Sequence, residues 1–317
     1  MIKKINHDCC LLSIGIILIS FVCFPNAAYS QDPNGFFEWG IGTSKLTFYP
    51  GEPVLLTINI TNNSTQEEDI DFGWDGLEAF SMEIFDSNNT ILCKDNKIKA
   101  KGGLSRVGRC RVTTGKNSSK KIILNRWCSS LLPPGLYHLK CNVDYRLFSE
   151  DQKQPNTRVF KAGPVHKTQL ELDIRIVEMD KPEFKKIIEN MGSVACQTEP
   201  DTQNKREWLD KRDLAREMLA FTESEMAVPY QLRILRVEQY TRLKQDIINS
   251  LVISGTPEAA NGLMQIIEDP NVFKEDIKND SISAVYRLRD TGKPDIINAT
   301  EGFAAKYKRP VLSEPVD

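Results

Sequence analysis

Histidine is scarce in this chain, and the short motifs that organise common catalytic sites are missing. Only three of the 317 residues are histidine. His7 lies within the first eight residues, which leaves His138 and His166 as the one pair from which a catalytic site could be built. The sequence has no G-x-S-x-G, no H-E-x-x-H and no glycine-rich phosphate loop. Nothing in the sequence aligns a carboxylate or a nucleophile with either histidine. We therefore expect no enzyme, and we assign no catalytic, cofactor-binding or metal-binding residue.

The chain also lacks an excess of charge of one sign. It has 41 Lys and Arg residues and 43 Asp and Glu residues, which gives a net charge of −2. Neither half has the basic surplus of a nucleic-acid-binding protein. After the first thirty residues, no apolar run is long enough to span a bilayer. We therefore expect no nucleic-acid partner and no membrane span beyond the N-terminal segment.

The first thirty residues have the layout of a secretory signal peptide. Met1–Asp8 carries two lysines, Cys9–Phe24 is apolar, and Ala28-Tyr29-Ser30 places small residues ahead of Gln31. The sequence predicts cleavage before Gln31 and a secreted or periplasmic mature protein. The alternative is an anchor formed by an uncleaved N-terminal helix, although the apolar run of roughly 16 residues is shorter than the ~20 that a spanning helix needs.

Five of the eight cysteines follow this segment. Four lie in the first half of the mature chain: Cys93, Cys110, Cys128 and Cys141. An even number in an oxidising compartment favours disulfide bonds. Cys128 and Cys141 flank the turn Pro133–Gly135 almost symmetrically, so a hairpin there predicts a Cys128–Cys141 bridge and leaves Cys93 with Cys110. Reduced buried thiols are one alternative. A zinc site is another, disfavoured because no C-x-x-C pair is present. Cys196 is either free or paired between chains.

Alternation of apolar and polar residues indicates that residues 31–177 form an all-β domain. In Val54–Thr61, Leu56, Ile58 and Ile60 point to one face, as expected for a strand with one buried side. Leu136–Leu147 and Gln169–Val177 alternate in the same way. Shorter candidate strands are Lys45–Tyr49, Phe80–Phe85, Thr90–Leu92, Arg106–Thr113 and Lys121–Trp127. Short strands separated by frequent turns predict an antiparallel sandwich.

Three polar segments of this domain are candidates for loops or binding sites. Ser149–His166 is predicted to be a long loop before the last strand. The acidic run Glu67–Asp71, with Asp75, is interpreted as a solvated loop rather than a calcium site. The basic stretch Lys97–Arg106 is interpreted as a solvated hairpin tip rather than an anion-binding loop.

Two segments of the β domain resemble immunoglobulin-like domains of bacterial extracellular proteins. Phe48–Asn63 is similar to their early strands, and Pro133–Val143 is similar to their late hairpin. The immunoglobulin Cys–Trp–Cys arrangement is absent. The resemblance implies an Ig-like β-sandwich in architecture only, and it implies no activity.

At Glu178 the apolar period changes from two residues to 3.6, which is typical of helices. Asp180-Lys181-Pro182-Glu183 is a helix start, because aspartate can cap the helix and proline is tolerated in its first turn. Phe184, Ile187, Ile188 and Met191 then share one face. Gly192–Lys205 is polar and predicted to be a loop, so residues 178–205 are interpreted as a helix and a polar linker.

The last part of the chain contains an internal repeat. Ile248–Gly262 aligns with Val285–Ala299 at an offset of 37 residues. The matched pairs are Leu251 with Leu288, Gly255 with Gly292, Pro257 with Pro294, and Asn261 with Asn298. Each unit is predicted to be a helix closed by glycine, followed by a helix opened by proline. This pattern resembles HEAT-like repeats and implies a solenoid of helix pairs; a generic helical bundle is the alternative.

These features predict a multidomain β-plus-α chain. Its parts are a signal peptide (1–30), an Ig-like β-sandwich (31–177), a helix with linker (178–205) and a HEAT-like helical region (206–317). The whole resembles a secreted bacterial protein with these two modules. We expect an exported, non-enzymatic protein-binding or scaffold protein whose partner is another protein. A proteinase inhibitor that presents Ser149–His166 is the alternative, and an enzyme is less expected.

Overall fold

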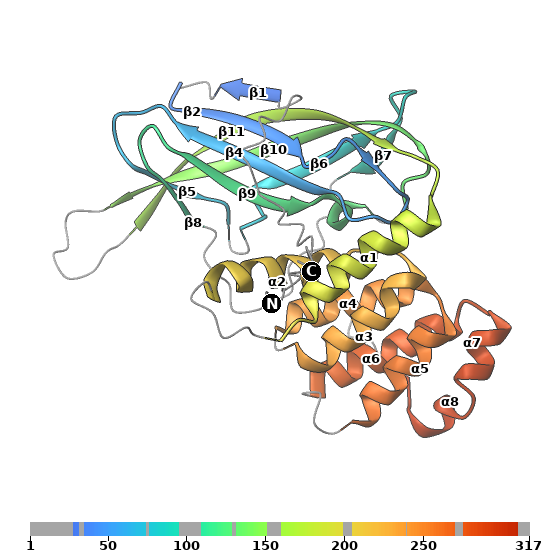
Figure 1. Ribbon diagram of the computed structural model, residues 1–317. Coiled ribbons are helices and arrows are strands. Elements are labelled where there is room, and N and C mark those ends of the chain that lie inside the picture. The colour runs from blue at the N-terminus through green and yellow to red at the C-terminus, as the bar shows by residue number, and fades with distance from the viewer. Residues whose placement is uncertain are drawn as a thin grey trace, which may run out of the picture.

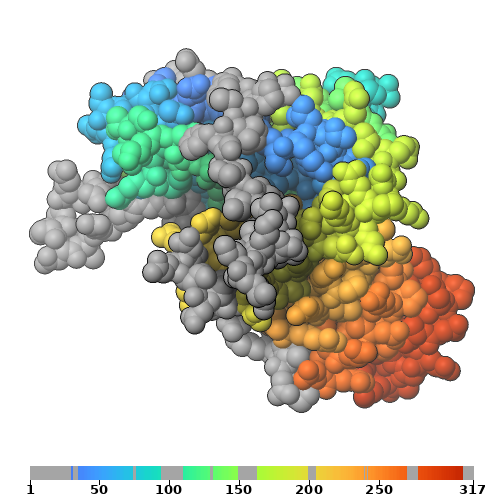
Figure 2. All heavy atoms as spheres, in the orientation of Figure 1, coloured from blue at the N-terminus to red at the C-terminus, as the bar shows by residue number. Residues whose placement is uncertain are grey.

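The fold is described by a computed structural model that covers residues 28–31, 35–73, 76–94, 109–128, 131–150, 160–198, 205–238, 240–269 and 275–309. Its N-terminal half consists of β-strands and its C-terminal half of helices (Figure 1), and the two halves occupy different ends of the molecule (Figure 2). The chain is therefore a β-plus-α protein, as the change of apolar period predicts. No helix within these ranges is long and apolar enough to cross a membrane.

The strands form two sheets. The first has the order β1–β2–β4–β9, made of Ala28–Gln31, Phe37–Thr43, Leu55–Asn62 and Asn117–Ile123. The second has the order β3–β11–β10–β5–β8, made of Thr47–Phe48, Phe160–Ile176, Gly135–Glu150, Glu68–Asp71 and Arg109–Val112. In addition, β6 (Phe80–Phe85) pairs with β10, and β7 (Ile91–Lys94) pairs with β6. The strand pairs are antiparallel except for β3 with β11, which is parallel.

The two sheets enclose one apolar core, which confirms the predicted sandwich. Leu56, Ile58 and Ile60 of β4 are completely buried, and the intervening residues are partly exposed. The inward residues of β10 and β11 are likewise buried: Tyr137, Leu139, Cys141, Val143, Tyr145, Leu170, Leu172, Ile174 and Ile176. Trp39 lies at the centre, with its ring 4.9 Å from that of Tyr145.

The hairpin predicted across Pro133–Gly135 is wrong. After β9 the chain turns into a 3-10 helix, η1 (Leu124–Trp127), because Leu124 and Trp127 are three residues apart and both enter the core. β10 then pairs with β11, β6 and β5, whereas β9 pairs with β4.

Cys128 and Cys141 therefore do not face each other across a turn. Cys141 lies opposite Met82 of β6 and Leu170 of β11. The cysteines in the described ranges form no disulfide bond: Cys93, Cys110, Cys128, Cys141 and Cys196. Neither predicted disulfide, Cys128–Cys141 or Cys93–Cys110, is present.

Two predicted loops are strands. β10 and β11 stay paired as far as Glu150 with Phe160, so both ends of the predicted loop Ser149–His166 continue the ladder. What is left between the strands, 151–159, is outside the described residues. Part of the acidic run forms β5, because Ile70 is buried in the core and the strand pairs with β8 and β10. Asp75 and the stretch 97–106 also lie outside the described residues.

The helical half begins as predicted. The Asp180 side chain accepts a hydrogen bond from the Glu183 backbone N–H at 3.1 Å and caps the first helix. The described helices are α1 (Lys181–Ala195), α2 (Lys205–Ala220), α3 (Val228–Val237), α4 (Thr241–Ser254), α5 (Pro257–Glu268), α6 (Glu275–Arg289), α7 (Pro294–Ala299) and α8 (Phe303–Lys306), with a 3-10 turn η2 (Glu225–Ala227) before α3. The predicted loop Gly192–Lys205 is shorter than expected, since α1 extends to Ala195.

The helices pack in two rows. α2, α4 and α6 contact one another in succession, and α3, α5 and α7 do the same beside them. Gly255 ends α4 in the left-handed conformation with φ 58°, and Gly292 follows α6 with φ 71°. Leu251 and Leu288 are both completely buried. The Lys293 Nζ donates to the Gly255 carbonyl at 2.9 Å, which joins the two glycine turns.

Candidate functional site

The β half and the helical half meet at an interface built around Arg126. This residue belongs to η1 of the sandwich, and its guanidinium reaches into the helices. Its Nη2 lies 2.8 Å from Glu217 Oε1 and 3.9 Å from Asp246 Oδ2. Its Cζ lies 4.6 Å from the centre of the Phe221 ring. With its side chain only 11% exposed, Arg126 supplies a nearly buried positive charge between the two halves.

A second set of contacts joins the loop after β3 to the helices. The Tyr49 hydroxyl donates to Glu183 Oε2 at 2.7 Å, and this hydrogen bond raises the pKa of Tyr49 to about 12. The Glu223 backbone N–H donates to the Gly51 carbonyl at 3.2 Å. Gly51 has φ +79°, and a Cβ there would lie 2.7 Å from the Glu223 carbonyl oxygen. Glycine is therefore required for both its backbone conformation and this close approach.

The interface contains a small cavity of about 20 Å³, lined by residues that include Gly51, Cys128, Leu131 and Glu223. It has room for about one water molecule and none for a metabolite. Burial raises the pKa of Glu223. Burial also raises the pKa of Asp246, an effect that Arg126 opposes. These features describe a brace between the halves rather than a binding pocket.

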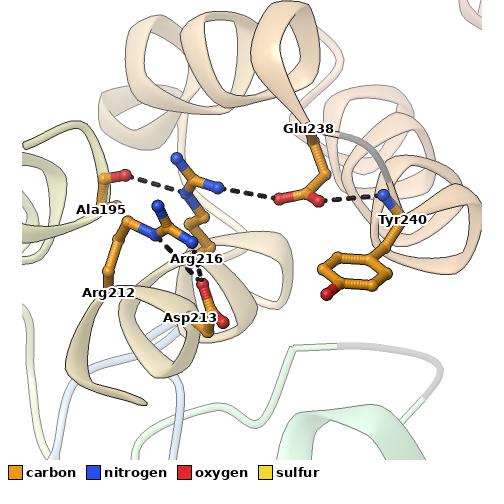
Figure 3. A network of polar contacts seen from close by, with 6 residues as sticks. All are labelled: Ala195, Arg212, Asp213, Arg216, Glu238 and Tyr240. Carbon is orange, nitrogen blue, oxygen red and sulfur yellow. Dashed lines mark hydrogen bonds and ion pairs between the residues drawn. The ribbon is translucent and has the colours of Figure 1, made fainter. Parts of the chain in front are cut away.

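A buried ion pair joins helices farther from the sandwich (Figure 3). Arg216 Nε donates to the Ala195 carbonyl at 3.0 Å, and its Nη1 donates to Glu238 Oε2 at 3.2 Å. Glu238 Oε1 accepts the backbone N–H of Tyr240 at 3.0 Å. Because each end of Arg216 has a fixed partner, this network ties the end of α1 and the start of α4 to α2. The network is structural, because its donors and acceptors bind one another rather than a ligand.

A roomier cavity than the one at the interface lies at the far end of the helical half. We call it the terminal groove. Its lining residues are Asn261, Met264, Gln265, Glu268, Glu301, Gly302, Phe303, Lys306 and Tyr307. Its volume of about 500 Å³ is within the range of ligand and side-chain pockets, which is roughly 300–1,000 Å³.

The terminal groove has an apolar floor and a polar rim. Phe303 is 4% exposed, and its ring lies 5.0 Å from that of Tyr307. On the rim, Lys306 Nζ lies 2.6 Å from Glu268 Oε1, so these two charges neutralise each other. Within the described part of the chain Glu301 has no ion pair, which leaves the rim with an acidic excess.

The two candidate histidines are not brought together. His138 lies on the outer face of β10, with Nδ1 2.8 Å from Asp173 Oδ1. His166 pairs with Tyr145 and stacks on its ring, with centroids 5.3 Å apart. The two sites are seven positions apart along β10, or about 23 Å at the usual rise per residue. The expectation that no carboxylate aligns with these histidines is wrong for His138, because β10–β11 pairing places Asp173 opposite it.

Within the described ranges, no group of three or more His, Cys, Asp or Glu residues could hold a metal ion. Among the residues of the terminal groove, the sequence patterns point only to Asn261, as part of the repeat. Their signal was present, since Phe303 and Tyr307 are four residues apart, a helical spacing that places both on one side.

Comparisons with known proteins add little to this description. No family model matches the chain, and no curated protein matches it. A mutant of Salmonella alpha-2-macroglobulin matches with a TM-score of 0.25 and 8% identity over 83% of this chain and 20% of that chain. A Bacteroides uniformis beta-glucuronidase 2, covalently bound to cyclophellitol-6-carboxylate aziridine, matches with a TM-score of 0.17 and 9% identity over 72% of this chain and 32% of that chain. This chain thus spans only a fifth to a third of either protein, and both TM-scores are too low to carry an argument about function.

Proposed function

We propose that this chain is an exported, non-enzymatic protein-binding or scaffold protein. In this proposal an Ig-like sandwich carries a HEAT-like array of helix pairs, and the terminal groove receives a segment of a partner protein. The observation that carries the proposal is the terminal groove, with its apolar floor and acidic rim. The partner segment would therefore present an apolar side chain next to a lysine or arginine.

Contacts between successive helix pairs support the HEAT-like interpretation. Arg287 Nη1 donates to Asn249 Oδ1 at 2.9 Å, over 38 positions of sequence. The Lys293–Gly255 contact and the Lys306–Glu268 contact also span 38 positions each. Contacts at a separation close to the 37-residue sequence offset are what stacked repeats produce, because each unit touches its neighbour in an equivalent place.

The position of the terminal groove also suits a binding role. It lies between α5 and the segment that contains α7 and α8, at the end of the helical half away from the sandwich (Figure 1). Met264 lines it with a flexible, polarizable side chain of a kind that adapts to different apolar partners. The brace at Arg126 holds the helices against the sandwich, so the array would be presented on a fixed support.

Binding can be tested by display of random peptides against the purified full chain. We expect enrichment of peptides that place an apolar residue beside a lysine or arginine. Met264→Lys should abolish this enrichment, because it adds a positive charge to the groove. The matched control is Ile253→Lys, which makes the same change at an exposed apolar residue of α4 outside the groove.

Circular dichroism of both variants checks that they remain folded. Selection of the same peptides by the wild type and by Met264→Lys would overturn the groove as the binding site. No enrichment by the wild type over an immobilised blank would overturn peptide binding altogether. Export of the chain is a separate part of the proposal, and N-terminal sequencing of the exported protein tests it.

A further inference from the structure

Two of the cysteine thiols contact each other across the sandwich. Cys93 lies in β7 of the second sheet, opposite Ile84 of β6, and is 2% exposed. Cys128 follows η1 and therefore continues from β9 of the first sheet. The two thiols share a hydrogen bond, so their sulfur atoms are neighbours although 35 positions separate them in sequence.

The other described cysteines have different surroundings. The Cys110 sulfur lies 3.2 Å from the Ser118 hydroxyl. Cys141 is completely buried, and Cys196 lies in the helical half at the end of α1. Cys93 with Cys128 is thus the thiol pair that the fold itself assembles within the described residues.

We propose that Cys93 and Cys128 form a redox-sensitive pair that closes into a disulfide bond between the two sheets of the sandwich. The oxidant is a small or protein-borne disulfide, such as oxidised glutathione. This inference does not depend on the terminal groove or on its partner.

The reaction follows ordinary thiol–disulfide exchange. Cys128 is half-buried whereas Cys93 is buried, so the Cys128 sulfur is the one of the pair that reacts first with an external disulfide. Cys128 loses its proton, its thiolate attacks one sulfur of the oxidant, and one thiol leaves with that proton. Cys93 then loses its proton, attacks the Cys128 sulfur of the mixed disulfide and releases the second thiol. Two protein thiols are oxidised, and one disulfide is reduced to two thiols.

The surroundings of the pair make this exchange slow near neutral pH. The hydrogen bond to Cys93, burial and the nearby Glu223 carboxylate all raise the pKa of Cys128. Because the thiolate is the nucleophile, a raised pKa lowers its population. Oxidation should therefore accelerate as the pH rises above neutral.

The test uses the full chain, first reduced and then incubated with oxidised glutathione. Remaining thiols are alkylated and the peptides are mapped by mass spectrometry. We expect one cross-linked peptide pair that contains Cys93 and Cys128, with Cys110, Cys141 and Cys196 alkylated. The disulfide closes a loop that spans both sheets, so the Tm should rise by roughly 5–10 °C and return to its original value on reduction.

Cys128→Ser should lose both the cross-link and the Tm increase, whereas Cys110→Ser, the matched control, should retain both. A bridge from Cys128 to Cys110 or to Cys141 would overturn the proposal. So would a folded, oxidised wild type in which Cys93 and Cys128 are both still alkylated. Because mapping of the wild type decides the matter alone, a variant that fails to fold does not weaken the test.

Discussion

Replacing Arg126 with methionine should loosen the contact between the two halves of the protein. Methionine keeps an apolar stem of similar length but removes the charge that faces Glu217, Asp246 and Phe221. The pair with Glu217 contributes little, at most about 1 kcal/mol, because Glu217 is 42% exposed. The cation–π contact with Phe221 contributes about 1 kcal/mol. Leaving the Asp246 carboxylate buried with Arg242 as its remaining cation costs on the order of 1–3 kcal/mol.

The free energy of unfolding should therefore fall by about 3 kcal/mol, measured by urea denaturation of the full chain. The double variant Arg126→Met with Asp246→Asn should recover part of the loss, because the buried charge is removed. Arg212→Met is the matched control. Arg212 also lies over an aromatic ring, that of Trp208 at 4.8 Å, and beside a carboxylate, but within one helix. Its replacement should cost about 1 kcal/mol or less.

The cost of Arg126→Met should also depend on pH. Burial raises the pKa of Asp246 in the folded protein, and Arg126 lowers it, so the variant has the higher pKa. A carboxyl group with a raised folded-state pKa binds its proton more tightly when folded, and it therefore favours folding more as the pH falls through that pKa. The destabilisation should thus be largest near neutral pH and smaller in acid. An equal loss at both pH values, or a loss no larger than that of Arg212→Met, would refute the assignment of a buried charge to this interface.

Three further outcomes are expected. Glu223→Gln should raise the Tm near neutral pH, because it removes a carboxylate whose pKa is raised by burial. This increase in Tm should disappear in acid, where Glu223 of the wild type is protonated. A lower Tm of the variant at neutral pH would contradict this. Gly255→Val and Gly292→Val should each lower the free energy of unfolding by about 1–3 kcal/mol, because both sites have positive φ. The two losses should be similar, because the Lys293 Nζ that a Cβ at Gly255 would meet at 2.9 Å is the flexible end of a side chain and can move. A silent variant at either site would make the 37-residue alignment a coincidence. N-terminal sequencing of the exported protein should begin at Gln31, and an intact first segment in a membrane fraction would favour the anchor.

Strands with one clean buried face were predictable from the sequence, and strands without one were not. Leu56, Ile58 and Ile60 alternate with polar residues, and their burial follows from that pattern. β2 was missed because Gly40 and Gly42 weaken the strand signal. Residues on both of its faces are buried, which removes the alternation. β5 was missed because Ile70 is its single apolar residue, and the strand exists through pairing with β8 and β10.

Pairing between distant segments accounts for the main errors. A turn at Pro133–Gly135 suggests a local hairpin, but β10 takes its partners from strands that lie far from that turn in the sequence. Because the strands pair differently from the prediction, the cysteines also have different neighbours from those predicted. Arg126 shows the same limit, since nothing in its local sequence indicates that Glu217 and Asp246, about a hundred positions away, will face it. Helix boundaries such as Asp180 and Gly255 depend on local chemistry and were therefore predictable.

The predicted cleavage site and the first strand occupy the same residues. Ala28–Gln31 forms β1, which pairs with Glu38–Ile41 of β2, and the Ser30 hydroxyl accepts a hydrogen bond from Thr168 at 3.2 Å. Cleavage before Gln31 would remove three of the four residues of β1 and leave the outer edge of β2 without this partner. A peptidase needs an extended, accessible segment, which a paired strand does not offer. Removal of the leader at this position must therefore precede the pairing of β1 with β2. The mature sandwich would then carry an unpaired edge at β2, where the full chain has a strand.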